Sequence, residues 1–322
     1  MRKFVIAAAV IATAGSSAFA VHRAGRKTLC DGFLPPNNLS IPVGDVNALG
    51  IDEAVFNSVI DRADKIYGPI VASKGGRLSF NRRWTDATVN ASAQQMGGTW
   101  VVNMYGGLAR HAAVTEEGFA LVVCHELGHH IGGYPKSSWA TNEGGADYFA
   151  TLKCMRRMYG EAAPLGDVDP VAAAGCSGQF PDGAGRNGCL NGARGGQSVA
   201  FLFQALRNSP TPPKFDTPNR TVVDRMFNQH PETQCRLDTY YQGALCGAQL
   251  GTDVSNSDAN AGACTAKNGQ TVGLRPRCWY KPPADEPAAV EPLLMARPQL
   301  PDAEKVGLKL EALREALSGR GI

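Results

Sequence analysis

A chain of 322 residues that is 43% hydrophobic and 19% charged can bury a substantial core, so its composition excludes a disordered protein. Its formal net charge is +3, and two of the positive charges, Arg2 and Lys3, lie in a segment that we expect to be removed. The small charge that remains argues against a nucleic-acid partner, because nucleic-acid binders concentrate positive charge in a patch or stripe.

Residues 1–20 have the pattern of a secretory signal peptide. The basic residues Arg2 and Lys3 precede an apolar run, and Ala18 and Ala20 form a small-x-small cleavage site. The apolar run is shorter than the roughly 20 residues that a helix needs to span a bilayer. We therefore predict an exported protein, periplasmic or extracellular, with no stable membrane insertion after cleavage.

Nine cysteines fit an oxidising compartment, where disulfides form and persist. Three pairs each flank a short stretch with loop character, which predicts local disulfides for Cys176/Cys189, Cys235/Cys246 and Cys264/Cys278. Because the number is odd, at least one thiol is expected to be free or paired elsewhere. None of these pairs has the CxxC spacing of a zinc finger or a redox motif.

After a lead segment, residues 21–50, the pattern predicts one helix and three strands. Ile51, Val55 and Val59 recur at helical spacing. Gly97 and Gly98 mark a turn between strand-like runs. We expect a helix over residues 51–67 and strands over residues 78–84, 87–93 and 99–104.

Two further helices are predicted next along the chain. Thr115 is a suitable N-cap, because Glu116 and Glu117 occupy the first turn after it. Gly132-Gly133 is expected to end that helix. The second helix is predicted to start between residues 138 and 141 and to run through "EGGADYFATLKCMRRMYG".

Glycine- and proline-rich segments interrupt the second half of the chain. Residues 160–196 are rich in Gly, Ala, Pro and Asp, which predicts a long surface insertion closed by a disulfide. Helices are expected over residues 197–207 and 220–228. A Cys-containing extension, residues 251–280, precedes a Pro-rich linker and an amphipathic C-terminal helix within residues 281–322.

The run His125-Glu126-Leu127-Gly128-His129 is an HExxH motif on the first of the two adjacent helices. Side chains four residues apart on a helix lie about 6 Å apart on one face, so both imidazoles point at one spot. This arrangement suits two ligands of a zinc ion, with Glu126 as the general base. The alternative is a solvated helix with incidental histidines, but the apolar run "FALVVC" before the motif indicates burial.

A catalytic zinc ion needs a third protein ligand and one open position. Glu143 on the second helix is the candidate third ligand for one Zn²⁺ per chain. Asp147 lies four residues further on the same face, where it can accept a hydrogen bond from the outer nitrogen of His125. We expect His130 to be structural, and Cys124 to be a core or disulfide residue and not a ligand.

Three segments resemble the M48-type zinc metallopeptidases of the gluzincin group. The pair "HELGH" and "EGGAD" is similar to the HExxH and ExxAD pattern of that family. Upstream, "TVNASAQQMGGTWVVNMYGGLARH" is similar to its Asn-Ala strand and Gly-Gly turn, and downstream "NQHPETQCRLDTY" is similar to its His-Pro-x-x-x-x-Arg element. The chain thus resembles a soluble, exported member of the family.

This resemblance implies an α+β fold, a mainly helical zincin-like metallopeptidase domain with a small antiparallel sheet over residues 51–250. The active-site helix would lie beside the Glu-bearing helix. The resemblance implies His125, His129 and Glu143 as zinc ligands, Glu126 as the catalytic base and Asp147 as the residue that orients a ligand histidine.

The resemblance also extends to four residues outside the helix pair. The strand at Asn90-Ala91 would pair with the backbone of an extended substrate, although Asn90 equally suits a turn or the end of a strand. Two roles stay open for His230: a donor to the oxyanion of the transition state, or a cap for the following helix. Arg236 is expected in a structural ion pair.

Together these features predict an exported zinc-dependent endopeptidase that acts on protein or peptide substrates. The alternative is a zinc-stabilised peptide-binding or chaperone-like module with little or no proteolysis. Hydrolysis of a non-protein amide, such as a cell-wall crosslink, is a third option that nothing in the sequence favours over peptides.

Overall fold

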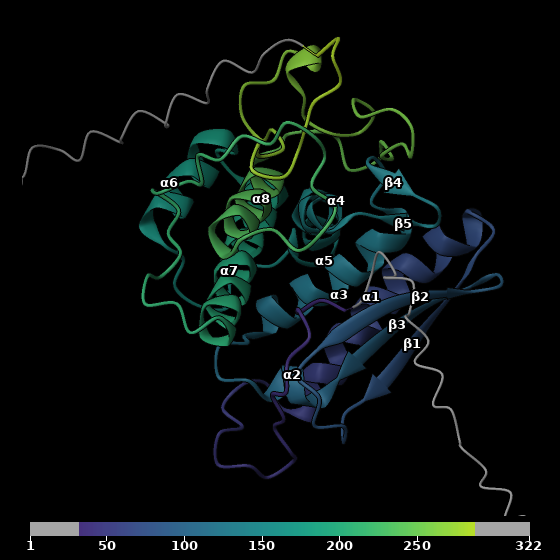
Figure 1. Cartoon of the computed structure of the whole chain (residues 1–322), viewed down its shortest axis with the longest axis vertical. Coiled ribbons are helices and arrows are strands. Elements are labelled where there is room, and N and C mark those ends of the chain that lie inside the picture. The colour runs from purple at the N-terminus through teal and green to yellow at the C-terminus, as the bar shows by residue number, and fades with distance from the viewer. Residues whose placement is uncertain (1–31, 287–322) are drawn as a thin grey trace, which may run out of the picture.

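The computed structural model describes residues 32–286, and within this range the chain folds as an α+β protein (Figure 1). The predicted signal peptide and the predicted C-terminal amphipathic helix lie outside the described residues. Among residues 32–286, no helix combines the length and the apolar character that a membrane span requires.

A three-stranded sheet follows helix α1 (Glu53–Ser73), and β3 is its central strand. Strands β2 and β3 form an antiparallel hairpin because only Gly97 and Gly98 separate them, whereas β1 pairs with β3 in parallel. The predicted antiparallel sheet is therefore a mixed one. Its strands are β1 (Arg77–Arg83), β2 (Ala91–Met96) and β3 (Thr99–Tyr105).

The strand predicted over residues 87–93 begins only at Ala91. Before that point, the chain pairs with the lead segment and not with the sheet: the Ile41 amide donates to the Ala87 carbonyl at 2.9 Å, and Ser40 bridges Thr88. The N-terminal lead thus takes part in the fold from its first described residue.

Helix α3 (Glu116–Ile131) runs through the middle of the molecule (Figure 1), in contact with α1, β2, α4 and α7. The Thr115 hydroxyl accepts a hydrogen bond from the Gly118 amide at 3.1 Å, so the predicted N-cap is confirmed. The helix ends before Gly132, also as predicted. Every residue from Glu117 to Ile131 is buried, which places the HExxH motif inside the protein.

The second predicted helix starts slightly later than expected, because a short hairpin precedes it. This hairpin pairs β4 (Lys136–Ser137) with β5 (Ala140–Thr141). The Asn142 side chain then accepts from the Gly145 amide at 2.9 Å and caps α4. Helix α4 (Glu143–Phe149) continues through a π-helical segment (Ala150–Met155) into α5 (Arg156–Tyr159).

The prediction of a long surface insertion at residues 160–196 is wrong. This region forms α6 (Pro170–Gln179) and most of α7 (Gly183–Leu206), which packs against α3 and α8 (Thr233–Leu245). The glycines of α7 serve close packing: a Cβ on Gly196 would lie 2.9 Å from the Cβ of Tyr240. Glycine content alone therefore gave a false indication of a loop. The short α2 (Gly106–Arg110) follows β3 directly.

The helix predicted over residues 220–228 is also absent from the structure. Here the Val223 amide donates to the Arg277 carbonyl at 3.0 Å, and the Phe227 amide donates to the Trp279 carbonyl at 2.9 Å. The backbone groups that a helix would use internally are paired with the extension at residues 251–280 instead.

Four disulfides join the described cysteines. Cys176–Cys189 is confirmed, but the other two predicted pairs are wrong, because Cys235 and Cys246 lie at opposite ends of α8, roughly 16 Å apart along the helix. The remaining bonds are Cys124–Cys154, Cys235–Cys278 and Cys246–Cys264. Such a set is typical of an oxidising, exported environment. Cys30 lies outside the described residues.

Replacing Cys124 and Cys154 together by alanine should lower the free energy of unfolding by about 2–4 kcal/mol, because the bridge restricts the unfolded chain. Urea unfolding monitored by circular dichroism measures this change. Replacing Cys176 and Cys189 by alanine should lower the free energy of unfolding by a smaller amount, because these cysteines are separated by 13 residues instead of 30. Equal stability of the Cys124/Cys154 variant and the unmodified protein would contradict a structural role for this bond.

Candidate metal centre

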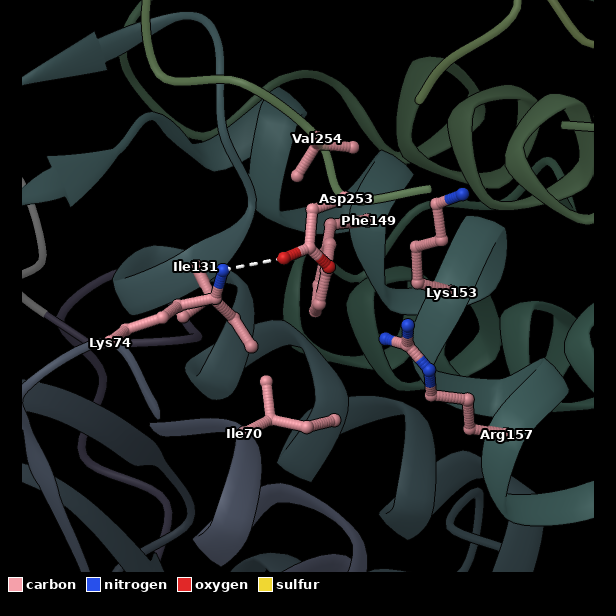
Figure 2. A pocket seen from close by; sticks show the side chains of 8 residues that line it. All are labelled: Ile70, Lys74, Ile131, Phe149, Lys153, Arg157, Asp253 and Val254. Atoms are coloured by element: carbon pink, nitrogen blue, oxygen red, sulfur yellow. Dashed lines mark hydrogen bonds and ion pairs between the residues drawn. The ribbon is translucent and has the colours of Figure 1, made fainter. Parts of the chain in front are cut away.

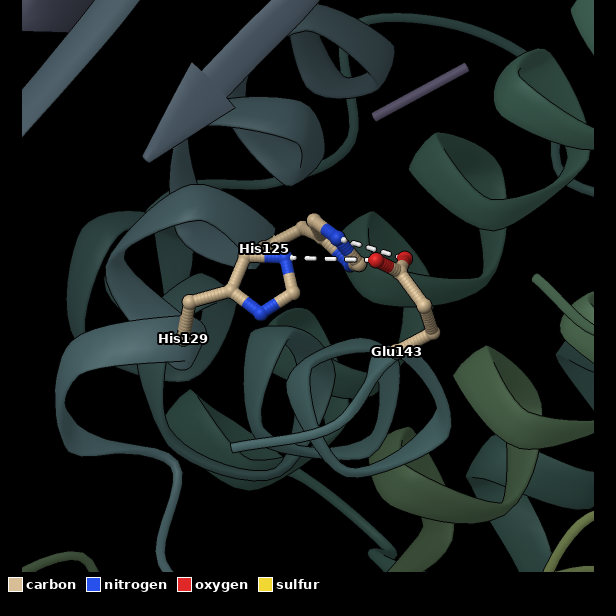
Figure 3. Close-up of side chains that lie close together, drawn as sticks. All are labelled: His125, His129 and Glu143. Carbon is tan, nitrogen blue, oxygen red and sulfur yellow. Dashed lines mark ion pairs between the residues drawn. The ribbon is translucent and has the colours of Figure 1, made fainter. Parts of the chain in front are cut away.

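The side chains of His125, His129 and Glu143 point toward one another where α3 meets α4 (Figure 3). One ligand atom from each residue lies within 4.8 Å of the others. His125 Nε2 is 3.3 Å from Glu143 Oε2, and His129 Nε2 is 3.7 Å from Glu143 Oε1. All three side chains are buried, and together they could hold a metal ion.

This convergence depends on how closely α3 and α4 approach each other. The helical period places the two imidazoles on one face of α3. Next to that face, Gly128 lies against Ala146 of α4, and a Cβ on Gly128 would be only 2.9 Å from the Ala146 Cα and carbonyl oxygen. Glycine between the two histidines therefore lets α4 come near enough for Glu143 to reach them.

Six buried atoms at this point have no hydrogen-bond partner. They are His125 Nε2, His129 Nε2 and both carboxylate oxygens of Glu143 and of Glu126. A buried polar atom without a partner costs about 1–3 kcal/mol, and more if it is charged. A divalent cation would give partners to the imidazoles of His125 and His129 and to the carboxylate of Glu143, since such ions bind these donors. The residues present therefore fit a metal ion.

Each imidazole is oriented by a hydrogen bond from its outer nitrogen. His125 Nδ1 lies 2.7 Å from Asp147 Oδ1, and His129 Nδ1 lies 2.8 Å from the carbonyl of Thr141. A carbonyl can only accept, so Nδ1 of His129 carries the proton and Nε2 presents its lone pair to the site. Asp147 has the position predicted for it, whereas the Thr141 carbonyl had no signature in the sequence.

Arg236 on α8 forms a paired hydrogen bond with Asp147. Its Nε donates to Oδ2 at 2.8 Å and its Nη2 donates to Oδ1 at 2.7 Å. Burial alone would raise the pKa of Asp147, but the charges of Arg236 and His125 and their hydrogen bonds hold it below its usual value. The carboxylate thus stays ionised and can accept from His125. Arg236 lies in an ion pair, as expected.

Burial and charge also set the protonation of the ligand residues. Burial alone would raise the pKa of Glu143, but the neighbouring imidazoles of His125 and His129 lower it to about 2. Burial lowers the pKa of His129 to about 4. Burial alone would lower the pKa of His125, but Asp147 and Glu143 raise it to about 9. Metal binding at Nε2 of His125 therefore competes with a proton.

Glu126 follows His125 on α3 and is fully buried. Burial raises its pKa to about 8, with the charge of Glu143 acting in the same direction. A carboxyl group with this pKa can both accept and donate a proton near neutral pH.

His230 lies beside the metal-binding group and does not cap a helix. Its Nε2 is 3.5 Å from Glu143 Oε2 and 2.8 Å from the carbonyl of Gly32, to which it donates. The N-cap of α8 is Glu232, which leaves the predicted capping role of His230 without support in the structure. A molecule bound next to Glu143 would therefore lie near the side chain of His230.

Asn90 and Ala91 contact the backbone of another segment, but it is the lead segment of the same chain. The Phe33 amide donates to the Ala91 carbonyl, and the Leu34 amide donates to Asn90 Oδ1, both at 2.9 Å. Ala91 begins β2, an edge strand of the sheet. The apolar pair Phe33-Leu34 within a proline- and asparagine-rich lead was the one signal in the sequence for this contact.

His130 and Cys124 lie on α3 but outside the metal-binding group. His130 stacks on Trp100 with ring centroids 5.4 Å apart, and its Nε2 lies 3.3 Å from the Val101 carbonyl. Cys124 is bonded to Cys154. Both residues are structural, as predicted.

Two pockets lie near the ends of the elements that carry the site. The first, of about 10 Å³, adjoins Ile131 at the end of α3 (Figure 2). Lys74 closes it by an ion pair with Asp253 at 2.6 Å, and no member of the metal-binding group lines it. The second, of about 190 Å³, is lined by Asn142, the residue before Glu143, and by Tyr134 and Met226.

Comparison of the chain with protein-family models, with curated proteins and with solved structures gives no match. The resemblance to M48-type metallopeptidases therefore stays a prediction from the motifs, and the geometry of the site carries the argument below.

Replacing His129 by alanine should remove the bound metal ion, because one of three ligands is lost. The expected loss of affinity exceeds the roughly 10- to 100-fold that removal of an outer hydrogen-bond partner causes. Metal content after dialysis measures it, with His130→Ala on the same helix as the control. A full complement of metal in folded His129→Ala protein would refute the ligand assignment.

Replacing Asp147 by asparagine should weaken metal binding by about 10- to 100-fold, because the amide orients His125 less strongly. It should also lower stability, since the buried charge of Arg236 loses its counterion. Competition with a chelator measures the affinity, and thermal unfolding measures the stability. Unchanged affinity would show that His125 is held by packing alone.

Proposed function

We propose that the protein is an exported zinc-dependent endopeptidase of the M48 type. One observation supports this proposal above the others: two imidazoles and a carboxylate converge with no other partner, next to a second buried carboxylate on the same helix turn. The first three supply metal ligands and the fourth supplies a base, which is the division of roles that the HExxH motif requires.

The donor set suits zinc and a catalytic use of it. Two nitrogens and one oxygen are donors that zinc accepts, and a structural zinc site would normally have four protein ligands. The group that the described residues form has only three. Bound zinc would polarise the carbonyl of a scissile peptide bond and lower the pKa of a water molecule.

Glu126 would move the proton during hydrolysis. It takes a proton from the attacking water as the new carbon–oxygen bond forms, and it passes that proton to the leaving amine as the carbon–nitrogen bond breaks. Its carboxylate oxygens have no competing partner.

His230, Asn90 and Ala91 would hold the substrate. Nε2 of His230, which donates to the Gly32 carbonyl in the structure, lies 3.5 Å from Glu143 Oε2. Once the carbonyl of Gly32 is displaced, this N–H would be a donor that can stabilise the oxyanion of the tetrahedral transition state. Asn90 and the Ala91 carbonyl, which accept from the Leu34 and Phe33 amides in the structure, would bind the backbone of a substrate in the same way once those residues are displaced. Binding of this kind depends mainly on the main chain of the substrate and is tolerant of its side chains.

A second candidate function is a metal-stabilised peptide-binding module with little or no proteolysis. It is favoured by the lead segment, which contacts His230, Asn90 and Ala91 and would restrict turnover. Digestion of an unfolded protein separates the two functions, because only the endopeptidase produces chelator-sensitive fragments.

Replacing Glu126 by glutamine should reduce hydrolysis of casein by about 10²- to 10⁴-fold, because the amide cannot accept the proton. Bound metal should be retained, since Glu126 is not one of the converging ligands. Fragment release from casein with and without chelator measures the effect. Glu53→Gln, at an exposed position on α1, is the control, and hydrolysis by Glu126→Gln at the control rate would rule out the base assignment.

A further inference from the structure

The lead segment forms a strip along one edge of the site. Residues 32–41, here called the N-terminal strip, lie beside residues 87–91, and Ser40 forms an antiparallel bridge with Thr88. The Phe33 amide donates to the Ala91 carbonyl at 2.9 Å at one end, and the Ile41 amide donates to the Ala87 carbonyl at 2.9 Å at the other. The strip thus extends from the start of β2 toward the surface.

The first residues of the strip reach the candidate metal centre itself. The Gly32 carbonyl accepts from His230 Nε2 at 2.8 Å, and the Phe33 carbonyl accepts from Arg236 Nη1 at 3.2 Å. The Phe33 ring lies edge-on to the ring of His125, with centroids 4.9 Å apart. A metal-binding imidazole is therefore covered by an aromatic side chain of the strip.

The Asn90 side chain binds both backbone groups of Leu34. Its Oδ1 accepts from the Leu34 amide at 2.9 Å, and its Nδ2 donates to the Leu34 carbonyl at 3.3 Å. Three side chains of the site, those of Asn90, His230 and Arg236, thus bind the main chain of the strip. A peptide substrate held at this edge would use the same hydrogen bonds to its main chain.

The strip also has a sequence requirement at Gly32. This residue has a φ of +127°, and a Cβ there would lie 2.8 Å from Asn90 Nδ2. Phe33 and Leu34, which follow, are both completely buried. The site therefore accommodates a glycine, an aromatic residue and an aliphatic residue in succession.

We propose that Gly32–Leu34 is an internal peptide ligand that occupies the substrate-binding edge of the metal centre, and that this edge binds peptides of the Gly-aromatic-aliphatic class. This proposal rests on the proposed function, because only an endopeptidase would use this edge to bind a substrate. Its consequence is that the strip in place competes with other peptides for this edge and lowers their affinity.

The strip can be separated from the site without cutting a helix or strand. It is joined to α1 through residues 42–52, where Val43, Val46 and Leu49 are 56%, 89% and 70% exposed. A recognition sequence for a specific protease inserted at residues 43–47 would leave the strip held by non-covalent contacts alone. The cut strip can then be removed under mildly denaturing conditions.

The test measures binding of a labelled peptide, GFLPPNNLSI, which has the sequence of residues 32–41. The Glu126→Gln background prevents hydrolysis, so binding is read by fluorescence anisotropy independently of activity. The cut and stripped protein should bind the peptide saturably and at least about tenfold more tightly than the uncut protein. Alanine in place of the phenylalanine should weaken binding. The control carries the same protease site at the exposed residues 210–212 and should behave like the uncut protein.

Two results would overturn the proposal. One is equal binding of the peptide by the uncut and the stripped protein, which would place the binding site elsewhere. The other is loss of the circular dichroism signal when the strip leaves, which would make the strip an integral strand of the fold. Binding by the stripped protein together with no hydrolysis when Glu126 is present would refute the endopeptidase and leave the internal ligand intact.

A single substitution tests the same contact in the uncut protein. Gly32→Ala should increase binding of the labelled peptide by about tenfold, because the strained φ and the contact with Asn90 loosen the strip. Gly44→Ala is the matched control, since Gly44 also has a positive φ, +80°, but a Cβ there meets nothing within 4 Å. Equal effects of the two substitutions would contradict the proposal.

Discussion

The contact between Gly128 of α3 and Ala146 of α4 decides how near a carboxylate can come to a pair of imidazoles. Any side chain at residue 128 would meet the backbone of α4, and Glu143 would move away from His125 and His129. The rest of the site depends on that separation. The cap at Asn142 starts α4 at the residue that must reach the metal, so the ligand is held at the first position of a rigid helix.

Charge compensation links the site to α8. Asp147 is one turn beyond Glu143, and it accepts from His125 while Arg236 holds it ionised. The guanidinium of Arg236 lies over the rings of Phe33 and Phe203, 4.8 and 4.3 Å from their centroids. A buried arginine without Asp147 would be costly, so the packing of α8 and the orientation of His125 depend on the same carboxylate.

The lead segment also contacts the candidate metal centre, although the three candidate ligands come from helices. Phe33 packs against His125 and belongs to the main hydrophobic core, while the Gly32 carbonyl occupies the donor of His230. The side chains that suit a peptide substrate are thus engaged with peptide groups of the same chain. This arrangement connects the two candidate functions, because peptide binding and peptide hydrolysis would use the same edge of the sheet.

The sequence by itself determined the features that local geometry controls: the cap at Thr115, the end of α3 at Gly132, and the common face of His125 and His129. Each of these features depends on residues within about four positions of one another on a helix, so none of them needs a distant partner. Tertiary structure alone decided the parallel pairing of β1, the bonds Cys235–Cys278 and Cys246–Cys264, the packing role of the glycines in α7 and the partners of His230. Each of these joins segments far apart in the chain, and a pattern within one segment carries no information about the segment that it meets.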